Sequence, residues 1–113
     1  MKIILKKIPM AQLKSMAEKG FGNLVKAVVD VEKKIMAVDG ELHADEEALL
    51  LENGSKQENL WGINLYPGIN SPEWIEFDSM INLHPKSGNL SRGVENPQLR
   101  KKIVAIVSQL IEK

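Results

Sequence analysis

A chain of 113 residues, 43% hydrophobic and 27% charged, has the size and composition of one globular domain. Fifteen basic residues balance fifteen acidic ones, so no net charge draws the protein to nucleic acid or to an anionic membrane. The absence of cysteine excludes disulfides, thiol catalysis and cysteine-ligated zinc. The longest apolar run near the N-terminus is Ile3-Ile4-Leu5, which predicts a cytoplasmic protein without a membrane span.

The N-terminal residues predict a strand followed by a helix. Residues 1–8 are rich in β-branched side chains and precede Pro9, which cannot extend a strand ladder but suits a helix start. Apolar side chains then recur every three or four positions, as on one face of a helix, and Gly20 and Gly22 end the pattern. The members of this stripe are Met10, Leu13, Met16, Ala17 and Phe21.

The next segment predicts a β-hairpin. Residues 24–38 are rich in Val and Ile, and the polar residues 32–34 that interrupt them are typical of a turn, although no Asn-Gly pair is present. One face of the first strand is expected to be wholly apolar, with Val25, Ala27, Val29 and Val31. The other face carries Lys26 and Asp30 but also Val28, so we expect it to be only partly exposed to water.

Residues 46–53 predict a short helix, closed by Gly54 in the left-handed conformation. A buried strand remains an alternative here, because the three leucines 49–51 carry no usable period. Two further strands are predicted over residues 59–67 and 74–85, which are joined by a turn-rich segment and each end in proline.

The last helix is the most clearly marked element. It follows a glycine-containing loop over residues 86–96, with Asn96 as its N-cap and Pro97 at its first position, and its apolar stripe runs from Leu99 to Ile111. The whole pattern predicts a single α+β domain over residues 1–113. We expect an antiparallel-rich sheet of about five strands, two long helices on one face, and the short helix near 46–53. A binding site is then expected on the opposite, more polar face.

Glu41, His43 and Asp45 form the first candidate site. If residues 38–45 are extended, these side chains share one face with Asp39, and such a set suits a divalent metal or an acid/base pair. His43 and Asp45 are the metal ligands under this hypothesis. The interpretation that we favour is structural, with Asp45 as the N-cap of the 46–53 helix.

His84 extends this hypothesis to a catalytic site. It is the only other histidine, and it ends a predicted strand whose polar face includes Asn82, a candidate ligand-binding residue. A catalytic or metal site would need the two histidines to meet, with Asp45 or Glu41 between them. The sequence does not bring them together, and it indicates no particular cofactor.

Two further segments are candidate anion sites. Ser55, Lys56 and Gln57 follow a helix with a flexible glycine, although a capping box from Ser55 to Glu58 is the favoured explanation. In the loop before the last helix, the candidate ligand-binding residues are Asn89, Ser91 and Arg92. A guanidinium beside a helix N-terminus favours an anion, and the alternative is that Arg92 pairs with a surface acid.

The segments GELHADEEALLLENGSKQENLWGINLYP, WIEFDSMINLHP and GNLSRGVENPQLRKKI also carry a resemblance. Over nearly all of its 113 residues the chain resembles a small family of archaea and bacteria that is catalogued as a domain of unknown function. The resemblance implies a cytoplasmic, prokaryotic, compact single domain. It assigns no activity, and therefore no role, to any residue.

Two classes of function follow. The favoured one is a binding or accessory module that holds an anionic small molecule or a protein partner on its polar sheet face. The alternative is a small metal- or acid/base-dependent hydrolase that uses His43, Asp45 and Glu41. RNA binding is a further alternative, disfavoured because no aromatic-basic strand motif is present. A homodimer is expected, because the edges of an open sheet need cover and homodimers are the commonest soluble oligomers.

Overall fold

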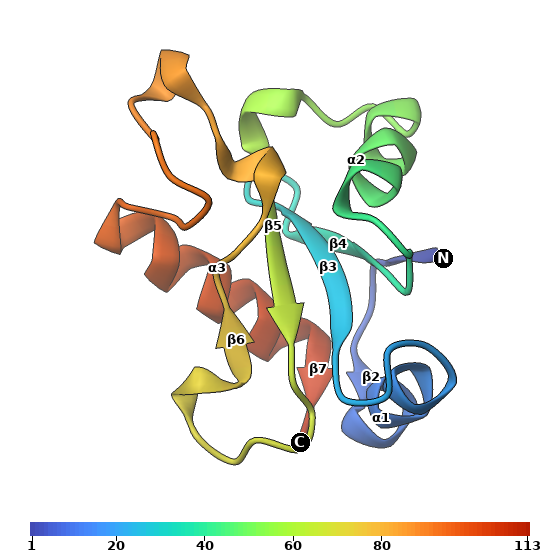
Figure 1. Ribbon diagram of the computed structural model, residues 1–113. Coiled ribbons are helices and arrows are strands. Elements are labelled where there is room, and N and C mark those ends of the chain that lie inside the picture. The colour runs from blue at the N-terminus through green and yellow to red at the C-terminus, as the bar shows by residue number, and fades with distance from the viewer.

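The computed structural model describes residues 1–113 and confirms the α+β fold with a five-stranded antiparallel sheet (Figure 1). In spatial order the sheet comprises β1 (Lys2–Ile4), β4 (Ile35–Val38), β3 (Val25–Asp30), β5 (Leu60–Leu65) and β6 (Ile75–Glu76). The α-helices are α1 (Met10–Lys19), α2 (His43–Glu52) and α3 (Pro97–Leu110). None of them combines the length and the apolar character needed to cross a bilayer.

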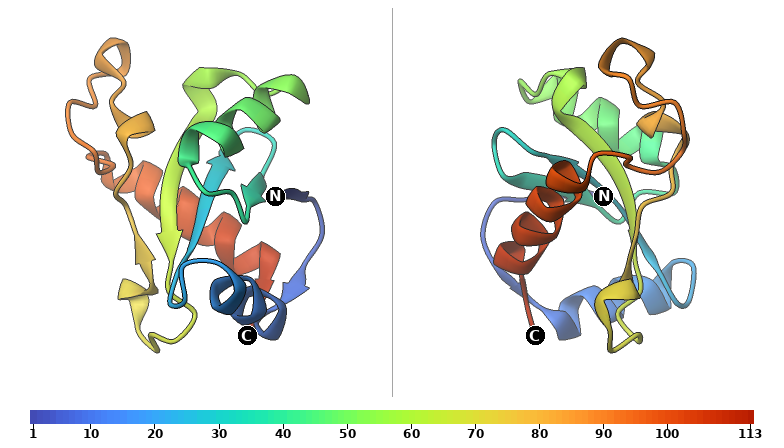
Figure 2. Two further views of the ribbon diagram at one scale, coloured as in Figure 1. Left: turned by 45° about the vertical axis from the view of Figure 1, so that its right-hand side comes forward. Right: turned by 90° about the vertical axis from the view of Figure 1, so that its left-hand side faces the viewer.

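The two long helices cover one face of the sheet and α2 covers the other (Figure 2). The main core joins α1 and α3 to the face of β3 that carries Val25, Ala27 and Val29, as predicted. A smaller cluster seals α2 against the opposite face; it consists of Val28, Ala37, Leu50 and Leu60. The apolar Val28 on the otherwise polar face is explained by this second layer, which makes the sheet interior dry on both sides near α2.

The predicted hairpin is confirmed, and a buried aspartate replaces the Asn-Gly signal that its turn lacks. One carboxylate oxygen of Asp30 accepts hydrogen bonds from the backbone N–H groups of Glu32 and Lys33, both at 2.9 Å. Lys34 then adopts a left-handed conformation with φ of 59°. An aspartate that binds the backbone of its own turn fixes the chain reversal where the sequence offers no glycine.

The two ends of the chain differ from the prediction. Residues 1–8 do not form one strand: β1 ends at Ile4, and a separate strand β2 (Ile8–Pro9) pairs in parallel with β7 (Ile111–Glu112) after α3. The last apolar residue of the predicted helix stripe, Ile111, therefore belongs to a strand. This small second sheet fastens the N-terminal segment to the C-terminus, a long-range contact that local pattern does not encode.

The predicted strand over residues 74–85 is wrong beyond its first residues, because only Ile75 and Glu76 pair with β5. Ser79 then caps a 3-10 turn by accepting a hydrogen bond from the N–H of Ile81. Farther along β5, the buried side chain of Asn82 takes the place of a strand partner.

Asn82 satisfies the open edge of β5 at Gly62. Its Oδ1 accepts from the Gly62 N–H at 2.7 Å, and its Nδ2 donates to the Gly62 carbonyl at 2.9 Å. The chain at Ser79 packs so closely against β5 that a Cβ on Gly62 would lie 2.6 Å from the Cβ of Ser79. An asparagine side chain that mimics a strand backbone thus satisfies β5 at Gly62, where β6 does not pair with it.

The N-cap of α3 is confirmed. Asn96 Oδ1 accepts hydrogen bonds from the N–H groups of Gln98 at 2.8 Å and Leu99 at 3.3 Å. Pro97 occupies the first helical position, where no N–H is needed. The sequence signal and the geometry agree because this cap is entirely local.

We expect Asn96→Ala to lower the free energy of unfolding by about 1 kcal/mol, the usual cost of losing an N-cap side chain. Asn96→Asp keeps the acceptor oxygen and serves as the matched control. Urea denaturation of the three proteins measures the difference. Equal midpoints for the alanine variant and the wild type would show that the cap contributes nothing.

Candidate functional site

The segment that carries Glu41, His43 and Asp45 is not extended. Helix α2 begins at His43, and its N-cap is Leu42, which offers no side-chain hydrogen bond. Asp45 lies exposed inside the first turn, so its prediction as an N-cap is wrong, and so is the shared face of an extended strand. Because no side chain caps α2, the positive end of the helix stays open toward the loop before it.

Glu46 is the unexpected residue of α2. It lies in the first turn, where an acidic residue is ordinary, yet its side chain is fully buried. One carboxyl oxygen accepts a hydrogen bond from the Gly40 N–H at 2.9 Å, and the other has no partner. Burial raises the pKa of Glu46 to about 9, with the Gly40 hydrogen bond opposing the shift. The group is therefore a neutral carboxylic acid at neutral pH.

His43 lies over the sheet beside a row of polar residues. Its Nε2 donates to the carbonyl oxygen of Ile63 at 2.8 Å. Burial lowers the pKa of the imidazole below its ordinary value; the bond to Ile63 opposes this shift, and the positive charge of Lys26 adds to it. The ring is accordingly neutral at pH 7 and has the protonation state of a general base.

The polar row beside His43 runs across three strands. In the sheet register Lys26 stands opposite Asn64, and Asn64 stands opposite Glu76. Asn64 Nδ2 donates to Glu76 Oε1 at 2.8 Å, while its own Oδ1 is buried without a partner. The row places an ammonium, an amide and a carboxylate on the face that α2 leaves partly open.

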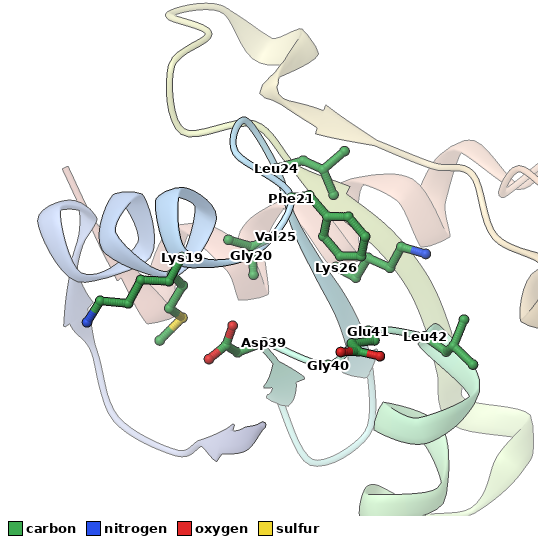
Figure 3. A pocket seen from close by; sticks show the side chains of 11 residues that line it. Lys19, Gly20, Phe21, Leu24, Val25, Lys26, Asp39, Gly40, Glu41 and Leu42 are labelled. Carbon is green, nitrogen blue, oxygen red and sulfur yellow. The ribbon is translucent and has the colours of Figure 1, made fainter.

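A cavity of about 590 Å³ opens between the segment after α1 and the loop before α2 (Figure 3). Lys19 comes from the last turn of α1, Phe21 from the segment after it, Lys26 from β3, and Asp39 and Glu41 from the loop. The prediction of Phe21 as a core residue of the α1 stripe is wrong, because the helix ends before it and its side chain is 51% exposed. The cavity is thus bordered by charges of both signs and one aromatic ring.

The charged groups around this cavity are not paired with one another. The only salt bridge of the protein joins Arg92 to Asp78. The Nζ of Lys26 instead lies 5.1 Å from the centre of the Phe21 ring, a cation–π contact. Asp39 adopts a left-handed conformation with φ of 67°, which is uncommon for any residue other than glycine. The loop 39–41 therefore holds a specific, mildly strained shape at the cavity wall.

The candidate anion site at Ser55, Lys56 and Gln57 is not a formed cradle. Ser55 is buried and its hydroxyl donates to Asp30 Oδ2 at 2.6 Å, so it supports the hairpin turn. The predicted capping box is wrong, since Lys56 is the N-cap of the 3-10 turn Gln57–Asn59 and no side chain caps that turn. The side chains of Lys56 and Gln57 are exposed.

The second candidate anion site is also engaged internally. Asn89 is buried, and its amide donates to the carbonyl oxygens of Asn82 at 2.7 Å and Gly93 at 2.8 Å. Arg92 pairs with Asp78 at 2.7 Å, the surface-acid alternative that the sequence left open. Ser91 accepts a hydrogen bond from the Gly93 N–H at 3.2 Å, which leaves this loop a structural unit.

The two histidines make separate contacts. His84 stacks on Trp61 with ring centres 4.3 Å apart, whereas the imidazole of His43 bonds to the carbonyl oxygen of Ile63. No group of three or more His, Asp or Glu side chains is placed to hold a metal ion. Among charged side chains, Lys26 and Asp78 act on the His43 imidazole, rather than Asp45 or Glu41.

Sequence reasoning missed Lys26, Glu46 and Asn64 as members of this region. One signal for Lys26 and Asn64 was present, because each is a polar residue inside an otherwise apolar strand, where burial demands a partner. No signal marked Glu46, since a glutamate near the start of a helix is ordinary. Its burial depends on how α2 packs against the loop at Gly40.

A family model described as "Protein of unknown function (DUF5674)" matches residues 2–110. The match spans nearly the whole chain, and the chain therefore belongs to this family. The comparisons with curated proteins and with solved structures gave no match.

Proposed function

We propose that this DUF5674 protein is a small binding module, and that it holds a small anionic molecule in the cavity beside the N-terminus of α2. A carboxylate or phosphate of the ligand would lie near Lys26 and Lys19. Hydroxyl or amino groups on the same ligand would donate to the carboxylates of Asp39 and Glu41. A hydroxy acid, an amino acid or a sugar phosphate has this combination of groups.

The observation that carries the proposal is the state of Lys26. Its side chain is half-buried in the cavity wall, and it forms no salt bridge. A partly buried ammonium loses part of the stabilisation that water gives it. An opposite charge replaces this stabilisation in full, and an aromatic ring replaces it only in part. An anion that enters the cavity supplies that charge.

The open end of α2 supports the same ligand chemistry. Leu42 lines the cavity, and the helix that starts after it has no side-chain cap. Uncapped N–H groups and the helix dipole favour negative charge at this end. The exposed Asp45 in the first turn opposes this preference, whereas Glu46 does not, because its carboxyl group is neutral at the pH of interest.

We expect an anionic ligand at about ten times its dissociation constant to stabilise the protein by about 1.4 kcal/mol, a shift of several degrees in Tm. Thermal unfolding with inorganic phosphate, a sugar phosphate, a hydroxy acid and an amino acid measures it. Lys26→Met should abolish the shift, because it removes the charge and keeps the length of the side chain. Lys14→Met, an exposed lysine of α1 outside the cavity, should leave the shift unchanged.

Two outcomes of this screen speak against the proposal. An anion that stabilises Lys26→Met as strongly as the wild type binds elsewhere, and a screen in which no anion shifts Tm leaves the cavity without an anionic ligand. Stabilisation by divalent cations that disappears in His43→Ala would favour the hydrolase alternative, since the neutral imidazole of His43 is the group suited to hold a metal or to move a proton.

A further inference from the structure

The segment from Met80 to Leu90 projects from the body of the domain (Figure 1). Three of its apolar side chains are exposed. Met80 is 62% exposed, Leu83 40% and Leu90 70%. None of the three belongs to either core cluster. Met80 and Leu83 line the same hollow, and exposed apolar side chains that lie together mark interaction surfaces. No residue of this segment lines the cavity beside α2.

The projecting segment is held in one shape from within. His84 and Asn89 exchange backbone hydrogen bonds of 3.0 and 3.1 Å, and the buried amides of Asn82 and Asn89 tie the segment to its base. The stacking of His84 on Trp61 fixes its orientation against the core. A surface that is ordered before binding loses little conformational entropy when a partner docks.

A hollow of about 570 Å³ separates this segment from α2 and the turn after it. Met80 and Leu83 line one wall together with Lys86, while Glu47 and Glu58 line the other. None of these three charged groups forms a salt bridge within the protein. The hollow therefore offers an apolar wall and unpaired charges of both signs, and it shares no lining residue with the cavity of the proposed function.

We propose that a second copy of this chain docks on this surface and forms a two-fold symmetric dimer. In such a dimer the same patch meets itself, so the patch must complement its own charges. A patch with one sign of charge would repel its copy, but this one places Lys86 and Glu58 on opposite walls of the hollow. The Lys86 of one protomer then faces the Glu58 of its partner, and Leu83 and Met80 fill the apolar centre.

Light scattering coupled to size-exclusion chromatography over a wide range of protein concentration tests the proposal. The wild type should reach twice the protomer mass of 12.6 kDa. Leu83→Glu should raise the dimer dissociation constant by about tenfold or more, because it places a charge in the apolar centre. Val104→Glu is the matched control, since Val104 is equally exposed, at 40%, on α3. A wild type that stays monomeric, or a Leu83→Glu dimer as tight as the control, overturns the proposal.

A charge exchange tests the symmetry independently of any effect of Leu83→Glu on folding. Lys86→Glu and Glu58→Lys should each weaken self-association by about tenfold, because each brings like charges together. An equimolar mixture of the two variants should regain the wild-type affinity as a heterodimer, since both contacts then pair opposite charges. A mixture that associates no better than either variant alone contradicts the two-fold arrangement.

Discussion

Replacing Glu46 by Gln should raise the free energy of unfolding at pH 7 by about 3 kcal/mol. The carboxyl pKa is about 9 in the folded protein and ordinarily 4.5, so the folded state keeps a proton that the unfolded chain releases between these values. Stability from Glu46 is fully present below pH 4.5 and is lost as the pH rises toward 9. At pH 7 the solution is about 2.5 units above the unfolded-state pKa of 4.5. Each unit lowers the free energy of unfolding by about 1.4 kcal/mol.

Glutamine removes this dependence and keeps the shape of the side chain. Its carbonyl oxygen takes over the hydrogen bond from the Gly40 N–H, and its amide replaces the carboxyl oxygen that has no partner. Urea denaturation of both proteins at several pH values between 4.5 and 9 should give a falling stability for the wild type and a flatter one for Glu46→Gln. The two curves should converge below pH 4.5, where the carboxyl group becomes protonated in the unfolded chain as well.

Glu52→Gln is the control, because Glu52 is exposed on the same helix and should leave the pH dependence unchanged. Parallel curves for Glu46→Gln and the wild type would mean that Glu46 ionises normally in the folded protein. The fully buried position against Gly40 would then not hold in solution.

Replacing Asn82 by Ala should lower the free energy of unfolding by about 3–5 kcal/mol, because it leaves several buried backbone groups without partners. The N–H and the carbonyl of Gly62 lose their hydrogen bonds, and so does the carbonyl of Arg92. Each unsatisfied buried group costs roughly 1–3 kcal/mol. Chemical denaturation monitored by Trp fluorescence measures the loss.

Asn70→Ala is the matched control, since Asn70 is exposed and makes no side-chain hydrogen bond. Its midpoint should lie within about 0.5 kcal/mol of the wild type, as for most surface substitutions. A loss of similar size for Asn82→Ala would show that water or a rearranged chain satisfies Gly62, and that Asn82 does not end the sheet. The projecting segment that follows would then lack its internal support.

The cavity includes only part of the segment that the sequence pattern singled out: Asp39 and Glu41 line it, whereas His43 and Asp45 do not. Its other charged and aromatic side chains, Lys19, Phe21 and Lys26, lie some twenty residues earlier in the chain. The anion candidates Ser55 and Arg92 proved to have partners inside the protein. Hydrogen-bond partners distant in sequence are invisible to a local pattern, so the residues left free for a ligand could not be distinguished from those already engaged.

The sequence by itself determined the elements whose signals are local: the α1 helix and its glycine stop, the Val-rich hairpin, β5, and α3 with its Asn96 cap. These follow from side-chain periodicity and capping, which act within a few residues. Only the tertiary structure decided that residues 77–85 form no strand, that Glu46 is buried, and that β2 pairs with β7. In each case a contact between distant segments outweighed the local preference. A buried polar group without a partner costs more free energy than a residue in a conformation that its propensity disfavours.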